Sequence, residues 1–212
     1  MKPHGTQPLV TAGVALEESH AAVIMVHGRG AGPENILDLR PRLNRPAFTY
    51  LAPAAAGNTW YPFSFMADTA KNEPGLSSGL QVLDDLVNSV VASGVRTDRI
   101  VLLGFSQGAC LTAEFAARHA TRYGGIIIFS GGLIGAPGTT WDYPGSFAGT
   151  PVFFGDSDVD AHVPKDRVDE SAVVFARLGA VVDKRIYPGM GHLVCDDEIA
   201  AAQGILDQVL RS

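Results

Sequence analysis

Val101-Leu102-Leu103-Gly104-Phe105-Ser106-Gln107-Gly108-Ala109-Cys110 joins an apolar run to a helix-forming run through the pattern Gly-x-Ser-x-Gly. The apolar run predicts a buried strand that ends in a tight turn. The flanking glycines lack a Cβ and therefore leave the Ser106 hydroxyl exposed above the sheet. Ser106 would lie at a helix N-terminus, where the N–H of Gln107 can meet an oxyanion. The pattern is typical of a nucleophile elbow, and a polar turn without chemistry is the alternative interpretation.

The rest of the chain repeats this alternation of apolar runs and helical patterns. Strands are predicted at 21–26, 48–51, 100–103, 124–130, 151–154 and 180–187, and helices at 33–43, 76–91, 109–117, 168–178 and 199–209. This alternation predicts an α/β fold with a mostly parallel central sheet flanked by helices. Because no repeat or linker interrupts it, we expect residues 1–212 to form a single domain. The connection 131–149 is long enough for a short flap but not for a large lid domain.

A glycine-rich loop, His27-Gly28-Arg29-Gly30, follows the first of these strands. The dinucleotide-binding interpretation fails because the third glycine of that fingerprint would fall on Pro33. The order His-Gly-x-Gly after an early strand instead resembles the loop that supplies a second oxyanion N–H in hydrolases, here from Arg29. A plain tight turn is the alternative.

Composition and charge exclude several classes of partner. The 212-residue chain is 46% hydrophobic and 18% charged, with a net charge of −6 and a pI near 5.4. No cluster of lysine and arginine is present to neutralise phosphates, so we expect neither nucleic acid nor an anionic membrane surface as a partner.

Cysteine usage and the N-terminal residues bear on the compartment. Cys110 and Cys195 are too few for a disulfide framework or a thiolate metal site, which favours a reducing compartment. The first residues contain no apolar signal region, and no stretch approaches eighteen apolar residues. We therefore expect a cytoplasmic protein without stable membrane insertion.

Three residue types with complementary chemistry follow one another in the order serine, acid, histidine. Ser106 comes first, acidic residues near position 160 follow a buried strand, and His192 follows the last strand on a turn bracketed by glycines. In such a triad the histidine takes the serine proton and returns it to the leaving group, while a carboxylate orients the imidazole. Of the six histidines, only His192 meets this order.

The chain resembles the phospholipase/carboxylesterase family of α/β hydrolases, the group that includes acyl-protein thioesterases. The resemblance covers nearly the whole chain. It rests on His27-Gly28-Arg29-Gly30, Ala52-Pro53 with Trp60-Tyr61, Gly104-Phe105-Ser106-Gln107-Gly108, Asp160-Ala161-His162-Val163-Pro164 and Pro188-Gly189-Met190-Gly191-His192. It implies an α/β-hydrolase fold, a triad of Ser106, Asp160 and His192, and an oxyanion hole formed by the N–H groups of Arg29 and Gln107.

The acidic member of the triad has a rival. The family spacing Gly-x-x-Asp-x-x-Val-Pro is stretched by two residues between Gly155 and Pro164. Counting forward from Gly155 selects Asp158, whereas counting back from Pro164 selects Asp160. We favour Asp160 because Pro164 is expected to open the next helix and so fix the residues just before it.

The expected activity is that of a serine carboxylic-ester hydrolase that works through an acyl-enzyme and needs no cofactor or metal. The substrate would be a small-molecule ester with a short to medium acyl chain, with thioesters and lysophospholipids as further options. We expect the acyl pocket to be lined by the apolar residues of the 54–71 stretch and one residue after the triad histidine, namely Trp60, Tyr61, Phe63, Phe65 and Leu193. Core packing under the loop is the alternative role for these aromatic residues.

Two other functions remain open. A hydrolase fold can serve as a non-catalytic small-molecule receptor, but such a protein has no need to keep a complete triad. An enzyme similar to dienelactone hydrolase is a nearer rival, although a cysteine in place of Ser106 would have supported it better. Whether the chain forms a homodimer stays open.

Overall fold

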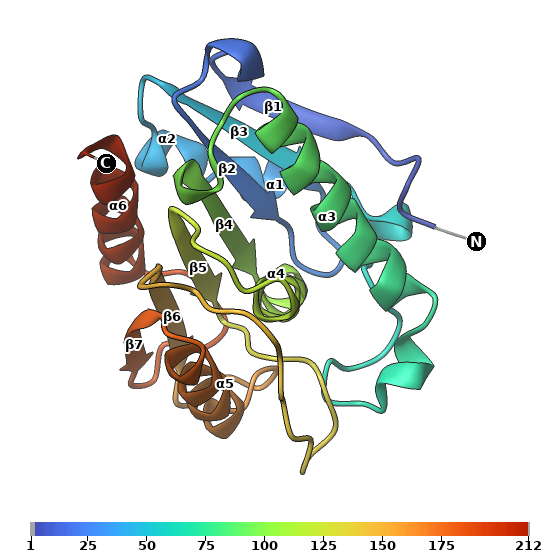
Figure 1. The fold of residues 1–212 in the computed structure, drawn as a ribbon. Coiled ribbons are helices and arrows are strands. Elements are labelled where there is room, and N and C mark those ends of the chain that lie inside the picture. Colours follow the sequence, from blue (N-terminus) through green and yellow to red (C-terminus); the bar gives the residue numbers. More distant parts are fainter. Residues whose placement is uncertain (1–2, 212) are drawn as a thin grey trace.

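Seven strands form one sheet in the order β1-β3-β2-β4-β5-β6-β7, and the computed structural model describes residues 3–211. The sheet runs through the middle of the molecule in Figure 1. All neighbouring strands are parallel except β1 and β3, which are antiparallel. The strands are β1 Leu9–Gly13, β2 Ala21–Val26, β3 Phe48–Pro53, β4 Ile100–Phe105, β5 Gly125–Phe129, β6 Pro151–Ser157 and β7 Val181–Tyr187.

Helices cover both faces of the sheet, as the alternating pattern predicts. They are α1 Pro33–Leu37, α2 Arg40–Leu43, α3 Gly75–Ala92, α4 Gln107–Arg118, α5 Lys165–Arg177 and α6 Asp196–Arg211, with single 3-10 turns at Leu16–Glu18, Ala56–Asn58, Thr69–Asn72 and Thr97–Arg99. The core on one face joins α3, α4 and α5 to the sheet, and the core on the other joins α1, α2 and α6. Among residues 3–211, none of the helices combines the length and the apolar character that a membrane crossing requires.

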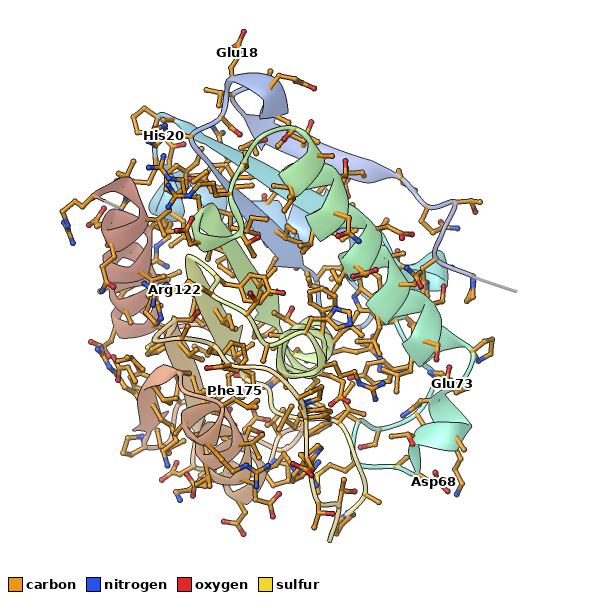
Figure 2. All side chains as sticks on the ribbon, viewed as in Figure 1. Glu18, His20, Asp68, Glu73, Arg122 and Phe175 are labelled. Carbon is orange, nitrogen blue, oxygen red and sulfur yellow. The ribbon has the colours of Figure 1, made fainter. Side chains whose placement is uncertain are left out.

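The buried strands supply both cores at once, because successive side chains of a strand point to opposite faces. In β2, Ile24 packs into the core under α3 and α4, whereas Val23 packs into the core under α6. Figure 2 shows Phe175 of α5 in the interior, where its ring lies 5.1 Å from that of Phe154, while Glu18 projects into solvent.

The single helix expected over 33–43 is divided into α1 and α2. Pro41 has no N–H and cannot donate to the carbonyl of Leu37, as a continuous helix would require. The chain therefore turns at Asp38 and Leu39 before α2 begins.

The long connection between β5 and β6 is fixed to two helices. Buried Glu114 of α4 accepts hydrogen bonds from the N–H of Ile134 at 3.1 Å and the hydroxyl of Tyr143 at 2.7 Å. Buried Arg167 of α5 donates to the carbonyls of Leu133 and Gly135 at 2.9 and 2.7 Å. Each of these buried groups also has an ion-pair partner on its own helix, Arg118 for Glu114 and Glu170 for Arg167. Their remaining hydrogen bonds go to the connection, which therefore packs as a fixed part of the fold.

Candidate active site

Ser106 occupies the turn between β4 and α4 in a strained backbone conformation, with φ 57° and ψ −121°. Such a conformation costs roughly 1–3 kcal/mol and persists only where the surroundings enforce it. A Cβ on Gly104 would lie 2.5 Å from the carbonyl oxygen of Gly108, and a Cβ on Gly108 would lie 2.2 Å from that of Val26. Only glycine fits at both positions, so the sequence pattern allows the close approach that places Ser106 at the carboxyl edge of the sheet.

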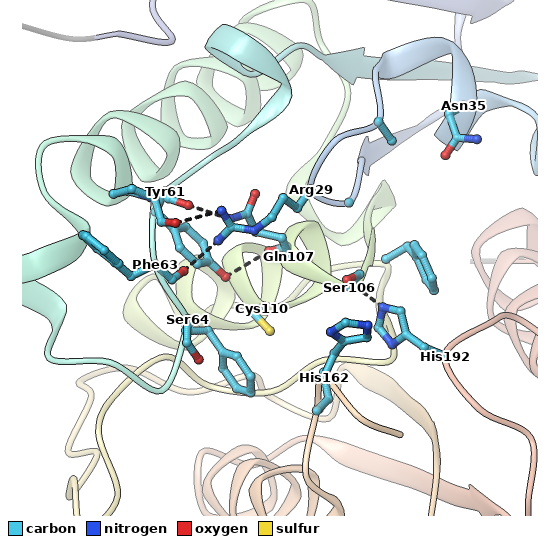
Figure 3. Close-up of a pocket in the computed structure, with 16 residues that line it drawn as sticks. Arg29, Asn35, Tyr61, Phe63, Ser64, Ser106, Gln107, Cys110, His162 and His192 are labelled. Carbon is cyan, nitrogen blue, oxygen red and sulfur yellow. Dashed lines mark hydrogen bonds between the residues drawn. The ribbon is translucent and has the colours of Figure 1, made fainter. Parts of the chain in front are cut away.

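A chain of hydrogen bonds links Ser106 to His192 and Asp160. The Ser106 hydroxyl lies 2.8 Å from Nε2 of His192, as Figure 3 shows, and Nδ1 of His192 lies 2.5 Å from Oδ2 of Asp160. An ionised Asp160 accepts from Nδ1–H, which leaves Nε2 to accept from the serine. This arrangement can move a proton from Oγ of Ser106 to the imidazole.

Three donors surround the buried carboxylate of Asp160. Besides the His192 ring, the N–H groups of His162 and Val163 donate to Oδ1 at 2.7 and 3.0 Å. Burial alone would raise the pKa of Asp160, but these hydrogen bonds outweigh it and the pKa lies below its usual range. Asp160 is therefore held as an anion, the form that can orient His192.

The rival carboxylate makes a different contact. Oδ1 of Asp158 accepts from the N–H of Gly189 at 2.8 Å. That contact braces the turn that leads to His192 and leaves the imidazole itself to Asp160.

The loop after β2 lies against the elbow. A Cβ on Gly28 would meet that of Ser106 at 3.3 Å. Within residues 3–211, the backbone N–H groups of Arg29 and Gln107 donate no hydrogen bond. Both residues line the same cavity as Ser106, so two donors are available beside the serine.

The side chain of Gln107 has a separate structural role. Its Oε1 accepts from the N–H of Trp60 at 2.9 Å, and its Nε2 donates to the carbonyl of Tyr61 at 2.8 Å. The Arg29 guanidinium donates to the carbonyl of Phe63 at 2.7 Å and turns away from Ser106 in Figure 3. The two residues expected to form the oxyanion hole thus hold the same neighbouring loop through their side chains.

A cavity of about 470 Å³ opens above Ser106. Its lining contains aromatic and small residues, one arginine and two histidines, and no aspartate or glutamate. The residues are Gly28, Arg29, Ala31, Asn35, Tyr61, Pro62, Phe63, Ser64, Phe65, Phe105, Ser106, Gln107, Cys110, His162, Val163 and His192. Three of the expected pocket residues, Tyr61, Phe63 and Phe65, are among them.

The connection between β5 and β6 does not form a flap over the described cavity, because none of residues 131–149 lines it.

The expectation was wrong for Trp60 and Leu193, which do not line this cavity. Trp60 is fully buried and its indole N–H donates to the carbonyl of His27 at 2.9 Å, so it packs beneath the loop. Leu193 directs its side chain to solvent and is 48% exposed. The alternative of core packing holds for Trp60.

His162 is a site residue that the sequence did not single out. Its ring lies 4.8 Å from the ring of His192, and both line the cavity. The ring of Phe105 approaches His192 at 5.1 Å from β4. Only the position of His162 two residues after Asp160 could have indicated its place beside the triad.

The cavity also contains the thiol of Cys110, one helical turn after Ser106. Burial raises the pKa of this thiol to about 12, so it stays protonated and is a poor nucleophile. Among residues 3–211, no three His, Cys, Asp or Glu side chains are placed to hold a metal ion.

Known proteins of one family are similar to this chain in sequence and in fold. The family model described as Phospholipase/Carboxylesterase matches residues 13–210. The chain is 24% identical to acyl-protein thioesterase 1 of Debaryomyces hansenii, over 96% of this chain and 97% of the relative. It is 23% identical to a probable SOBER1-like carboxylesterase of Arabidopsis thaliana, over 69% of this chain and just over half (56%) of that relative. A crystal structure of a phospholipase/carboxylesterase from Dyadobacter fermentans superposes with a TM-score of 0.90 at 40% identity, over 97% of each chain.

Proposed function

The chain belongs to the phospholipase/carboxylesterase family of ester hydrolases and has the α/β-hydrolase fold, and we propose that it hydrolyses carboxylic esters with Ser106 as nucleophile. The observation that carries this proposal is the unbroken hydrogen-bond chain from Ser106 through His192 to Asp160 beneath an open cavity.

The reaction follows from the position of these groups. His192 takes the proton of Ser106 as Oγ attacks the acyl carbon, and Asp160 stabilises the imidazolium that results. His192 then gives the proton to the departing alcohol, which leaves an acyl group on Ser106. A water molecule, activated by the same imidazole, releases the acid and restores the serine.

The backbone N–H groups of Arg29 and Gln107 stabilise the negative oxygen of each tetrahedral intermediate. Their freedom from other hydrogen bonds within the described chain, and their place beside Ser106, support this role. A fixed donor of this kind contributes about 10²–10³ to kcat.

The cavity favours uncharged acyl groups of short to medium length. Tyr61, Phe63 and Phe65 give it an apolar wall, and its volume of about 470 Å³ leaves little room for a long chain. Because one relative is an acyl-protein thioesterase, thioesters belong beside oxygen esters as candidate substrates.

The experiment is a profile of kcat/KM against p-nitrophenyl esters and acyl-thioesters of graded chain length. We expect a maximum at short or medium acyl chains and a steep fall beyond it. Ser106→Ala serves as the matched control and should lower every rate by roughly 10⁴ or more. Equal rates for the variant and the parent would favour a receptor with adventitious hydrolysis.

The compartment is a further part of the proposal. Both cysteines, buried Cys110 and partly buried Cys195, are free thiols, which suits a reducing cytoplasm. Fractionation of cells that produce the chain should recover it with cytoplasmic markers, and recovery with exported proteins would contradict this location.

A further inference from the structure

The His27 side chain is fully buried at the end of β2, and each of its ring nitrogens meets a backbone group. The N–H of Ala55 donates to Nε2 at 3.1 Å, and Nδ1 lies 2.8 Å from the carbonyl oxygen of Gly28. Because Nε2 accepts, the ring proton must reside on Nδ1, which donates to the Gly28 carbonyl. One neutral tautomer satisfies both contacts.

The Gly28 carbonyl shares a peptide unit with the N–H of Arg29. A trans peptide is planar, and its C=O and N–H point in opposite directions. The Gly28 oxygen accepts from Nδ1–H of His27 at 2.8 Å and, at the longer distance of 3.2 Å, from the N–H of Ala31. Because both donors lie on the carbonyl side of the peptide, the Arg29 N–H must point to the other side. Gly28 lies against Ser106, Arg29 lines the same cavity as that serine, and the Arg29 N–H has no other partner among the described residues.

We propose that His27 is a positioning residue that fixes the orientation of the Gly28–Arg29 peptide and thereby aims the Arg29 N–H at the oxyanion. The Gly28–Arg29 peptide plane could rotate to the opposite orientation, because Gly28 carries no Cβ to oppose the rotation. A reversed peptide would direct a carbonyl oxygen, and hence a partial negative charge, at the position of the oxyanion. This inference rests on the proposed function and deepens it.

The surroundings keep the His27 ring neutral, with its proton on Nδ1. The indole N–H of Trp60 donates to the His27 carbonyl at 2.9 Å, and the two rings lie 5.1 Å apart. Burial lowers the pKa of His27, which favours the neutral imidazole over the cation. A cation would carry a proton on Nε2 and would lose the hydrogen bond from Ala55.

His4 offers a matched control. Its ring is also buried and also meets two backbone groups, the carbonyl of Trp60 at 2.9 Å and the N–H of Ala56 at 3.0 Å. It packs on the same indole at 5.3 Å. Unlike His27, it does not contact the Gly28–Arg29 peptide, so its loss should affect folding stability without affecting the oxyanion donor.

The first test compares His27→Leu with His4→Leu in ester hydrolysis. We expect His27→Leu to lower kcat by about 10²–10³ with little change in KM, because the donor acts only on the oxyanion. The affinity for a trifluoromethyl ketone, which forms a tetrahedral adduct with the serine, should fall by a similar factor. His4→Leu should leave both quantities within about threefold of the parent. An unchanged kcat in folded His27→Leu, or an equal loss in His4→Leu, would overturn the proposal.

A second pair of variants decides the question if His27→Leu does not fold. The side-chain amide of asparagine places its N–H donor near the position of Nδ1, whereas that of glutamine places it near Nε2. His27→Asn should therefore retain most of kcat, and His27→Gln should lose it. Equal activity in the two variants would contradict the role of His27. Failure of the proposed function is recognised separately, because the parent protein itself would then lack hydrolysis that depends on Ser106.

Discussion

Asp158 and Asp160 lie two residues apart and carry the same carboxylate, yet they contact different parts of the site. β6 ends at Ser157, and Asp158 reaches across to the N–H of Gly189 in the turn after β7. Asp160 lies further along the loop and contacts Nδ1 of His192. The two carboxylates therefore have different partners, the turn after β7 for Asp158 and the imidazole of His192 for Asp160.

The paired variants Asp160→Asn and Asp158→Asn test this division of roles. Asp160→Asn should lower kcat by about 10⁴, because an amide favours the wrong tautomer of His192. Asp158→Asn should lower kcat far less, because the acceptor for the N–H of Gly189 loses only its charge. Steady-state kinetics on one ester measures both, and a greater loss in Asp158→Asn would reverse the assignment.

Asp156 is a third carboxyl at this edge of the sheet, and its side chain is fully buried. Burial raises its pKa to about 8, and the neighbouring Asp160 carboxylate acts in the same direction. In the unfolded chain an aspartate titrates near 3.9. Between these two values the folded protein keeps a proton that the unfolded chain has lost, so this group makes the free energy of unfolding fall as the pH rises.

Asp156→Asn should therefore change stability in a pH-dependent way. At pH 5 the variant and the parent should differ little. Near pH 9 the variant should be the more stable of the two, because an amide cannot ionise in the buried position. Urea denaturation at both pH values measures the difference in the free energy of unfolding. A difference that is constant or reversed between the two pH values would contradict the raised pKa of Asp156.

The turn from β4 to α4 depends on two close backbone approaches. Gly108 of α4 packs so tightly on the end of β2 that an added Cβ would lie 2.2 Å from the carbonyl oxygen of Val26. The helix therefore begins directly beside the loop that carries Arg29. This contact brings the two proposed oxyanion donors to one place.

Gly108→Ala should lower the free energy of unfolding by about 1–3 kcal/mol, because a backbone oxygen cannot move aside as a side chain can. Gly204→Ala is the matched control in α6, where an added Cβ meets nothing within 4 Å. It should raise stability by about 0.5–1 kcal/mol. Thermal unfolding of both variants measures these effects, and a Gly108→Ala protein as stable as the parent would contradict the packing.

The long apolar strands could be predicted from the sequence because a continuous apolar pattern is typical of a single environment, the interior of the protein. β2, β4 and β5 are buried on both faces, and continuous apolar runs are typical of such strands. β1 was not predicted. It is an edge strand of five residues with an alternating burial pattern, and its antiparallel pairing with β3 is a long-range contact that no local pattern reveals.

The loops of the site could be predicted only in part. Aromatic residues between 60 and 65 indicate a packed loop, but the same composition suits a cavity wall and a core. Trp60 packs in the core, where its indole N–H donates to the carbonyl of His27. Phe63 lines the cavity instead. Such partners lie far away in the chain and become visible only when it is folded.

The molecule as a whole brings Ser106, Asp160 and His192 together from the ends of β4, β6 and β7. Parallel strands place all their carboxyl ends at one edge of the sheet, so residues 86 positions apart in the chain, Ser106 and His192, meet at 2.8 Å. The order of the three residues could be predicted from the sequence. Their distances could not, since these depend on the strand order β4-β5-β6-β7.

The most direct test of the account is covalent labelling of the folded protein with a fluorophosphonate, followed by mass spectrometry of its peptides. We expect a single label on Ser106, because His192 activates this hydroxyl and two backbone N–H groups receive the phosphonyl oxygen. Ser106→Ala should remain unlabelled under the same conditions. A label on a different serine, or a folded parent protein that takes no label, would contradict the assignment of Ser106 as the nucleophile.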